Sequence, residues 1–146
     1  MITPKISVLM LTYNHAPYLK EAIEGVLMQQ TDFDFELIIC NDCSPDSSEQ
    51  VIQPFVDKHP EIISYFRHKK NIGFIENQRF AFKKANGKYI AYCEGDDYWT
   101  CPNKLQFQYD FLEKNSEFVM TTARNLVLHQ DDGKITNDGK DSIFEN

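Results

Sequence analysis

An acidic cluster follows a short apolar run in the middle of the chain. Residues 89–93 are apolar and β-prone, and they lead directly into Glu94, Asp96 and Asp97, three carboxylates within four residues. Carboxylates this close repel one another, and proteins keep such clusters mostly where a hard cation or a polar ligand offsets the repulsion. The cluster therefore predicts a Mg²⁺ or Mn²⁺ site at a strand end, with other metal positions open to water and a diphosphate. The alternative is a solvated acidic turn.

The segments around this cluster alternate between strand-like and helix-like patterns. Apolar runs at 6–11, 35–40, 62–66 and 88–93 have the length of buried strands. Apolar residues at helical spacing, with capping and stop residues, predict helices between these runs and a further one opened by Pro102. This order predicts an α/β fold, a three-layer αβα sandwich around a Rossmann-like, mostly parallel sheet with right-handed crossovers.

The boundaries of these elements follow from local signals. Asn14 is expected to cap the first helix, and Pro54 to kink or end the second. Gly87 is expected to mark the stop of a helix over 74–85. Residues 117–128 read as a further strand and 131–134 as a turn, so we expect one domain over 1–130 and a polar segment over 131–146. The apolar face of the 74–85 helix is expected to hold Phe74, Ala81, Phe82 and Ala85.

Small, polar or acidic residues occupy the carboxyl ends of all four predicted parallel strands. In open sheets of this kind, ligands bind outside the carboxyl ends of the strands. Helix capping accounts for single members of the set but not for the whole set. The residues that we expect to converge are Thr12, Tyr13, Asn14, Asn41, Asp42, Asn71, Gly73, Glu94, Gly95, Asp96 and Asp97.

Missing motifs narrow the choice of ligand. The sequence contains no G-x-G-x-x-G after the first strand and no G-x-x-x-x-G-K-[ST]. Without a glycine-rich cradle, a bound diphosphate needs a metal held by carboxylates, as the fourth strand end offers. Asp42 suits a hydrogen bond from a base imide or a ribose hydroxyl, since a carboxylate only accepts. Tyr13 offers a face for a planar base.

Composition excludes other classes. The chain has 146 residues and a formal charge of −7, which argues against a nucleic-acid partner. No run approaches a membrane span and no signal peptide opens the chain. We expect a cytoplasmic protein, with peripheral association to the inner face of the membrane left open. Residues 67–70 are basic and read as a solvated strand end. Cys40 and Cys93 are expected to be small buried hydrophobes rather than zinc or redox thiols.

Five segments, in order, resemble the family 2 glycosyltransferases, enzymes of the nucleotide-sugar-binding GT-A fold. They are residues 6–14, 36–46 with its D-C-S-P-D ending, 71–73, 87–91 and 94–97. Residues 95–100, followed by Pro102, Lys104, Leu105 and Gln106, are similar to a bacterial subgroup of that family. Together the resemblance covers residues 6 to 112.

The resemblance implies a glycosyltransferase that uses a nucleoside-diphosphate sugar, usually a UDP-sugar, with Mn²⁺ or Mg²⁺ and inversion at the anomeric carbon. Thr12, Tyr13 and Asn14 would border the nucleotide, and Asp42 would read the base. Glu94 would lie near the ribose, and Asp96 and Asp97 would hold the metal. Asn71, Gly73, Gly95 and Asp96 complete the donor-binding residues by position in the motifs. The implied acceptor is a glycan or a lipid-linked glycan in surface polysaccharide assembly.

The chain also departs from the family pattern. The position at which the family often has an arginine is Gln78, with Arg79 adjacent. Family members usually continue into an acceptor-binding half that carries the catalytic base, so we expect this chain to be the donor-binding half. Two alternatives remain, a non-catalytic nucleotide-sugar module and a sugar nucleotidyltransferase, although the latter would want a glycine-rich basic loop near 11–18. No base is assigned to the tail carboxylates Asp131, Asp132, Asp138, Asp141 and Glu145.

Overall fold

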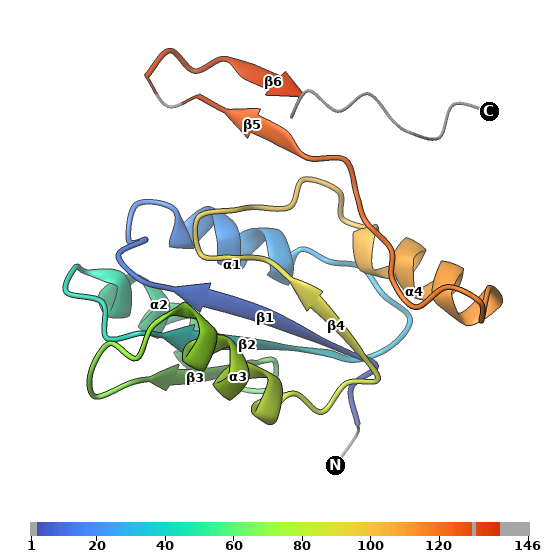
Figure 1. Ribbon diagram of the computed structural model, residues 1–146, viewed down its shortest axis with the longest axis horizontal. Helices are drawn as coiled ribbons and strands as arrows, with labels where there is room; N and C mark the ends of the chain where they lie inside the picture. The colour runs from blue at the N-terminus through green and yellow to red at the C-terminus, as the bar shows by residue number, and fades with distance from the viewer. Residues whose placement is uncertain (1–2, 130, 138–146) are drawn as a thin grey trace. The chain divides into compact units, whose positions relative to one another are not determined.

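A computed structural model describes residues 3–129 and 131–137 of the chain (Figure 1). The chain forms two compact units, the first ending at Tyr109 and the second beginning at Asp110. The first unit contains a four-stranded sheet, and the second contains a two-stranded hairpin. In the described residues, no helix is long and apolar enough to cross a membrane.

The sheet of the first unit is entirely parallel. Its strands are β1 (Ile6–Thr12), β2 (Phe35–Asn41), β3 (Ile63–Arg67) and β4 (Tyr89–Tyr92), in the spatial order β3-β2-β1-β4. β1 pairs with β2 in the register Ile6↔Phe35 and with β4 in the register Ile6↔Tyr89. The predicted mostly parallel sheet is therefore confirmed, with β1 and β2 as its two inner strands.

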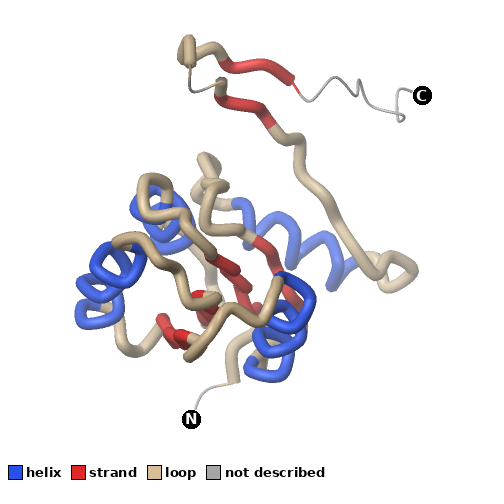
Figure 2. The backbone as a smooth tube through the Cα atoms, turned by 60° about the vertical axis from the view of Figure 1, so that its left-hand side comes forward, coloured by secondary structure: helices blue, strands red, loops and turns tan. Residues whose placement is uncertain are grey.

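Helices lie on both sides of this sheet, as Figure 2 shows. The helices are α1 (Leu19–Leu27), α2 (Ser48–Lys58), α3 (Phe74–Lys84) and α4 (Lys104–Lys114). Alternate residues of β1 and β2 face opposite sides, which is why both strands read as continuous apolar runs. One side packs in a core with α1, with Ile52 of α2 and with Leu105; the other packs in a second core with Ala81 of α3. The predicted three-layer sandwich is confirmed.

Two predicted helix signals were wrong in position. α1 begins at Leu19, and Asn14 does not cap it but adopts a left-handed conformation with φ of 64°. α2 does not end at Pro54, because the helix continues to Lys58. Ile52 and the partly buried Phe55 pack into the core on either side of Pro54. Burial of this apolar face outweighs the backbone hydrogen bond that proline cannot donate.

The predictions for α3 also need correction. Ala81 is buried, but Phe74 and Phe82 are exposed, and the buried polar member of the face is Asn77. Gly87 is not the stop of the helix, since the chain is already extended at Ala85. Instead, Gly87 lies against β1, where its amide donates to Ser7 Oγ at 2.8 Å and a Cβ would be 2.5 Å from the Ser7 nitrogen.

The second unit differs from the prediction of a long strand over 117–128. Its only described strands are β5 (Leu126–Leu128) and β6 (Ile135–Asn137), which pair antiparallel. The predicted turn at 131–134 is confirmed, with Gly133 at a φ of 70°. Asp131 and Asp132 belong to this turn, and Asp132 pairs with Lys134 at 2.6 Å. The expected polar tail and its Asp138, Asp141 and Glu145 lie outside the described residues.

The structure also tests the predictions for the buried cysteines and for the basic residues 67–70. Cys40 and Cys93 lie buried as predicted, and burial raises the pKa of each thiol to about 12. The basic segment lies at the end of β3 with Arg67, Lys69 and Lys70 exposed, as predicted for a solvated strand end. Within it, Arg67 pairs with Glu49 at 3.3 Å, and His68 is hydrogen-bonded to Asn77 at 2.9 Å.

Candidate functional site

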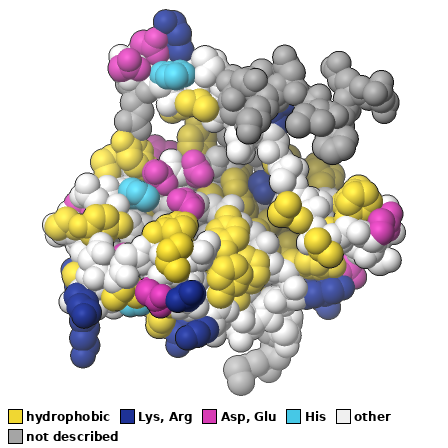
Figure 3. Space-filling model, viewed as in Figure 1, with side chains coloured by type: hydrophobic (Ala, Val, Ile, Leu, Met, Phe, Trp, Pro, Cys, Tyr) yellow, Lys and Arg dark blue, Asp and Glu magenta, His cyan; other side chains and the backbone are white. Residues whose placement is uncertain are grey.

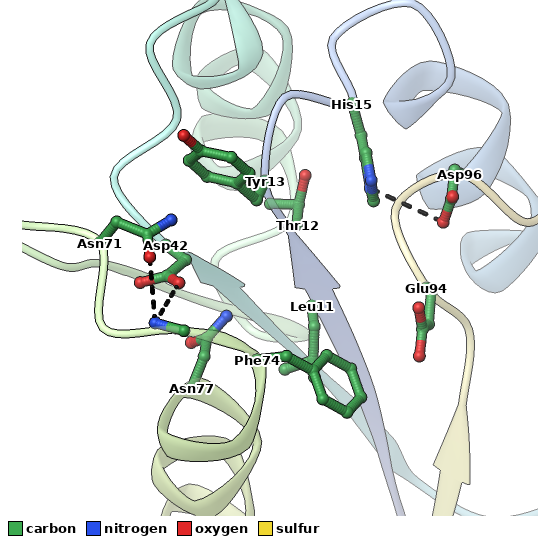
Figure 4. A pocket seen from close by; sticks show the side chains of 11 residues that line it. Leu11, Thr12, Tyr13, His15, Asp42, Asn71, Phe74, Asn77, Glu94 and Asp96 are labelled. Atoms are coloured by element: carbon green, nitrogen blue, oxygen red, sulfur yellow. Dashed lines mark hydrogen bonds and ion pairs between the residues drawn. The ribbon is translucent and has the colours of Figure 1, made fainter.

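A cavity of about 450 Å³ opens at the carboxyl ends of β1, β2 and β4, within the first unit (Figure 4). This is the edge of a parallel sheet at which ligands of α/β proteins bind. Its walls come from the residues that end β1, from the residue after β2, from the β3–α3 loop with the start of α3, and from the acidic loop after β4. The lining residues are Leu11, Thr12, Tyr13, His15, Asp42, Asn71, Gly73, Phe74, Asn77, Glu94 and Asp96.

Most of the residues expected from the sequence line this cavity, although four do not. Those that line it are Thr12, Tyr13, Asp42, Asn71, Gly73, Glu94 and Asp96. Asn14, Asn41, Gly95 and Asp97 lie next to lining residues in the chain but are not part of the wall, and Asn41 is fully buried. Their positions are described below, because Asn14 and Gly95 fix the backbone on which other site residues stand.

Asp42 organises one wall. Its side chain is 3% exposed, and its two carboxylate oxygens accept hydrogen bonds from the amides of Ile72 and Gly73 at 2.7 and 2.9 Å. Gly73 has φ of 83° and ψ of 158°, a backbone conformation that residues other than glycine rarely adopt. The β3–α3 loop is therefore clamped to the end of β2. Each carboxylate oxygen keeps a second lone pair with which to accept from a ligand.

The loop after β1 is held by the loop after β2. The Asn14 amide donates to Ser44 Oγ at 3.1 Å, and the Ala16 amide donates to Asp46 Oδ2 at 2.9 Å. Burial opposes the ionisation of Asp46, but hydrogen bonds from Ser48 and Ala16 outweigh it and lower the pKa of that carboxyl. The aspartate and serine spacing after β2 thus fixes two walls of the cavity, one through Asp42 and one through Ser44 and Asp46.

The acidic loop after β4 is tied to the end of β1. The Gly95 amide donates to the Leu11 carbonyl at 3.0 Å. A Cβ on Gly95 would lie 2.9 Å from Thr12 Oγ1 and 3.0 Å from His15 Nδ1, so only glycine allows this close approach. Glycine between Glu94 and Asp96 therefore lets the backbone of the acidic loop lie close to the end of β1.

The electrostatics of this loop favour a cation. Acidic side chains gather beside a histidine on the face that Figure 3 shows. Burial, and then repulsion from Asp96, raise the pKa of both Glu94 and Asp97, while His15 acts in the opposite direction. A divalent cation would relieve both the burial cost and the repulsion.

His15 and Thr12 contribute polar atoms that the protein itself does not satisfy. Thr12 Oγ1 and His15 Nδ1 are buried and have no hydrogen-bond partner in the described structure. His15 Nδ1 lies 3.7 Å from Asp96 Oδ1, longer than a hydrogen bond, as the dashed line in Figure 4 marks. Buried polar groups are normally paired, so these two atoms point to a ligand or a movement that completes the site.

Sequence reasoning missed four lining residues: Leu11, His15, Phe74 and Asn77. Leu11 and His15 flank the expected set at 12–14, and Phe74 directly follows Gly73, so the width of each motif was underestimated. Asn77 carried a clearer signal, since it is a polar residue on a helix face with Ala81, four residues later. The side-chain amide nitrogen of Asn77, Nδ2, donates to the Cys40 carbonyl at 3.0 Å and so joins α3 to the end of β2.

The residues present fit a divalent cation that shares its ligands with a bound molecule. No three His, Cys, Asp or Glu side chains in the described ranges are clustered closely enough to hold a metal by themselves. Mg²⁺, however, is usually bound through one or two carboxylates, with substrate phosphates and water as the other ligands. Carboxylates with raised pKa values beside a cavity are the donor set that such binding needs.

Comparison with known proteins identifies what this arrangement is similar to. A family model described as "Glycosyl transferase family 2" matches residues 7–132. An uncharacterized protein of Mycobacterium bovis is 33% identical over 129 residues, which are 88% of this chain and 37% of that protein. The minor teichoic acid biosynthesis protein GgaB of Bacillus subtilis is 39% identical over 92 residues, 62% of this chain and 10% of the relative. The chain therefore spans about a third or less of these relatives.

Solved structures share the fold. S. aureus TarS in complex with UDP superposes with a TM-score of 0.65 at 26% identity, over 77% of this chain and 33% of that one. TarS has also been solved in complex with UDP-GlcNAc. The mannosyltransferase PcManGT from Pyrobaculum calidifontis, in complex with GDP-Man and Mn²⁺, has a TM-score of 0.67 at 20% identity. That match covers 75% of this chain and 32% of the PcManGT chain, and at this identity it shows a likeness of fold alone.

Proposed function

Because the chain belongs to glycosyl transferase family 2, we propose that its cavity binds a nucleoside-diphosphate sugar whose sugar the protein transfers to an acceptor. One observation carries this proposal: a single cavity places the buried Asp42 at one wall and the carboxylates of Glu94 and Asp96 at another. A base can donate to the first, and a cation on a diphosphate is attracted by the second.

We propose a UDP-sugar as the donor. Asp42 accepts hydrogen bonds only, and the uracil imide is a donor. Tyr13 lies next to it in the cavity wall, with 46% of its surface exposed and free to pack against a planar base. The complex of TarS with UDP supports this choice, since TarS shares the fold at 26% identity.

We propose that Asp96 and Asp97 hold Mn²⁺ or Mg²⁺ and that Glu94 lies near the ribose. When bound, the cation supplies a Lewis acid that neutralises charge on the leaving nucleoside diphosphate. The raised pKa values of Glu94 and Asp97 support the assignment, as does the Mn²⁺ in the complex of PcManGT. Asp97 does not line the cavity in this structure, so its role is tested separately below.

The chain's own residues bind and orient the donor in this proposal. An acceptor hydroxyl then attacks the anomeric carbon opposite the diphosphate, the bond from that carbon to the diphosphate oxygen breaks, and configuration inverts. A base takes the hydroxyl proton. We assign that base to none of the described carboxylates, and a glycan or lipid-linked acceptor is proposed from the teichoic acid role in the name of GgaB.

The experiment that tests this function is a thermal-shift panel. UDP, GDP, ATP and UDP-GlcNAc are each added with Mn²⁺ and with EDTA. A ligand that binds the folded state raises the free energy of unfolding by RT ln(1 + L/Kd), where L is the free ligand concentration, so the melting temperature rises with the logarithm of ligand concentration. We expect the largest shift with UDP or UDP-GlcNAc plus Mn²⁺ and only a small one with EDTA. Equal shifts in both conditions, or a preference for ATP, would contradict the metal-bridged donor site.

A further inference from the structure

We propose that His15 is a positioning residue that orients the Asp96 carboxylate for the cation of the donor complex. The inference rests on the proposed function, because it assigns a task within the same site. His15 Nδ1 lies 3.7 Å from Asp96 Oδ1, and both side chains line the cavity. Figure 4 shows them facing one another from the β1–α1 loop and from the acidic loop.

The histidine is the fixed member of this pair. The amides on either side of it, those of Asn14 and Ala16, are each held by a side chain of the β2–α2 loop, at 3.1 and 2.9 Å. The His15 carbonyl also accepts from the amides of Tyr18 and Leu19 at 2.9 and 3.2 Å. The His15 side chain is 23% exposed.

The carboxylate is the movable member. The Asp96 side chain is 48% exposed, and no hydrogen bond from the protein fixes it in the described structure apart from its approach to His15. A short movement of Asp96 brings its Oδ1 within hydrogen-bond distance of Nδ1. That contact would satisfy the buried, unpartnered Nδ1 and leave Oδ2 of Asp96 free to face a cation.

Gly95 lets the acidic loop approach His15 closely. Because a Cβ at residue 95 would be 3.0 Å from His15 Nδ1, there is no room for a side chain between the backbone before Asp96 and the imidazole. The carboxylate therefore has little choice of partner among the described groups. Hydrogen bonds from residues that do not themselves touch the metal orient metal-binding carboxylates, and their removal typically weakens metal binding ~10–100-fold. A histidine that only packed against the loop would not need Nδ1 at all.

The test uses three substitutions of His15 and one matched control. In His15→Asn, the amide nitrogen takes the place of Nδ1; in His15→Gln, it reaches the place of Nε2; His15→Ala removes both. The control is His59→Asn. His59 Nδ1 lies 3.8 Å from Glu61 Oε1 with 27% exposure, a similar pair outside the cavity. UDP binding is measured by titration calorimetry at fixed Mn²⁺ and in EDTA, and the melting temperature of each variant shows that it is folded.

We expect His15→Ala and His15→Gln to weaken UDP binding ~10–100-fold with Mn²⁺ and to leave the EDTA value unchanged. His15→Asn should recover most of the loss, and His59→Asn should match the parent. In an Asp96→Asn background, His15→Ala should have no further effect, because the group through which it acts is already gone.

Other outcomes overturn the inference. Recovery by Gln but not by Asn would assign the contact to Nε2 and the donor itself. Equal loss with Mn²⁺ and EDTA, or equal loss in both backgrounds, would make His15 a structural residue. The double substitution decides the matter even if single variants lose stability, because it compares variants within one background. Failure of the parent chain to bind UDP with Mn²⁺ would instead refute the proposed function, a distinguishable result.

Discussion

Asp42 Oδ2 accepts a hydrogen bond from the Gly73 amide at 2.9 Å, so the end of β2 holds a loop that lies 31 residues further along the chain. Its other oxygen accepts from Ile72. The Asp42 side chain, which we expect to accept a hydrogen bond from a base, thus also holds the β3–α3 loop in place. The two tasks use different lone pairs of one carboxylate, and a substitution affects both.

Asp42→Asn should weaken UDP binding by ~1–3 kcal/mol with Mn²⁺ and by the same amount in EDTA. Asparagine presents an NH₂ group where one of the two backbone amides needs an acceptor, and it accepts less well from a base. Calorimetry in both conditions measures the effect. A loss seen only with Mn²⁺ would show that Asp42 acts on the metal side of the site instead.

Asp97→Asn should stabilise the metal-free protein and abolish its response to Mn²⁺. The folded-state pKa values of Asp97 and Glu94 are raised above 3.8 and 4.5 by burial and by Asp96, so the folded chain binds more protons than the unfolded chain. The free energy of unfolding therefore falls as pH rises through these raised values and stays low at neutral pH. Replacing Asp97 by asparagine removes one of these charges, and so it recovers part of the free energy of unfolding that is lost at neutral pH.

The measurement for Asp97 is the melting temperature in EDTA and in Mn²⁺ plus UDP, from pH 4 to pH 7. Asp57→Asn, on the exposed side of α2, is the control and should change neither value. A variant at Asp97 that is less stable than the parent in EDTA, or that keeps the full Mn²⁺ response, would show that this residue is not a metal ligand.

Ser44→Ala should lower stability by ~0.5–1.5 kcal/mol and weaken UDP binding, because the Asn14 amide loses its hydrogen bond to Ser44 Oγ and the β1–α1 loop loosens. Ser47→Ala is the matched control. Ser47 precedes α2, and its side chain makes no capping hydrogen bond. Urea unfolding and UDP titration of the two variants provide the comparison. Equal stability and equal UDP affinity of the two variants would mean that the hydrogen bond from Asn14 to Ser44 does not shape the cavity.

Pro54→Ala should raise the free energy of unfolding by about 1–3 kcal/mol without changing UDP affinity. Alanine restores an amide that can bond to the carbonyl four residues earlier, and removes the ring clash. The unfolded chain gains entropy, which subtracts ~0.4–1 kcal/mol from the benefit. Urea unfolding measures the net change. Destabilisation would show that α2 already accommodates Pro54 without a backbone cost.

Much of the fold follows from patterns that act locally. Strands buried on both faces read as continuous apolar runs, so β1 and β2 were predictable within a residue. The failures share a cause: tertiary burial decided them. Pro54 stays helical because its neighbours pack in the core, and the exposed Phe74 and Phe82 show that apolar spacing alone does not tell which face of α3 is buried.

The candidate site was predictable in outline for a related reason. Carboxyl ends of parallel strands share one edge, so polar residues at four such ends had to lie near one another. The partners of those residues were not predictable, because they lie roughly 30 to 80 residues away along the chain. Nothing in the sequence indicates that Ser44 serves Asn14, or that Gly95 brings the acidic loop against His15.

The position of β1 between β2 and β4 has a consequence for biosynthesis. β1 is translated before both strands that it pairs with, and all seven of its residues are buried in the finished sheet. One of its edges stays unpaired until β4 emerges; the Ser7 hydroxyl, for example, accepts from the Gly87 amide 80 residues later. At ~5–20 residues per second, the ribosome needs roughly 4–16 s to supply that partner. During that interval an apolar strand with an open edge is available to other nascent chains, so slower translation before β4 should favour aggregation.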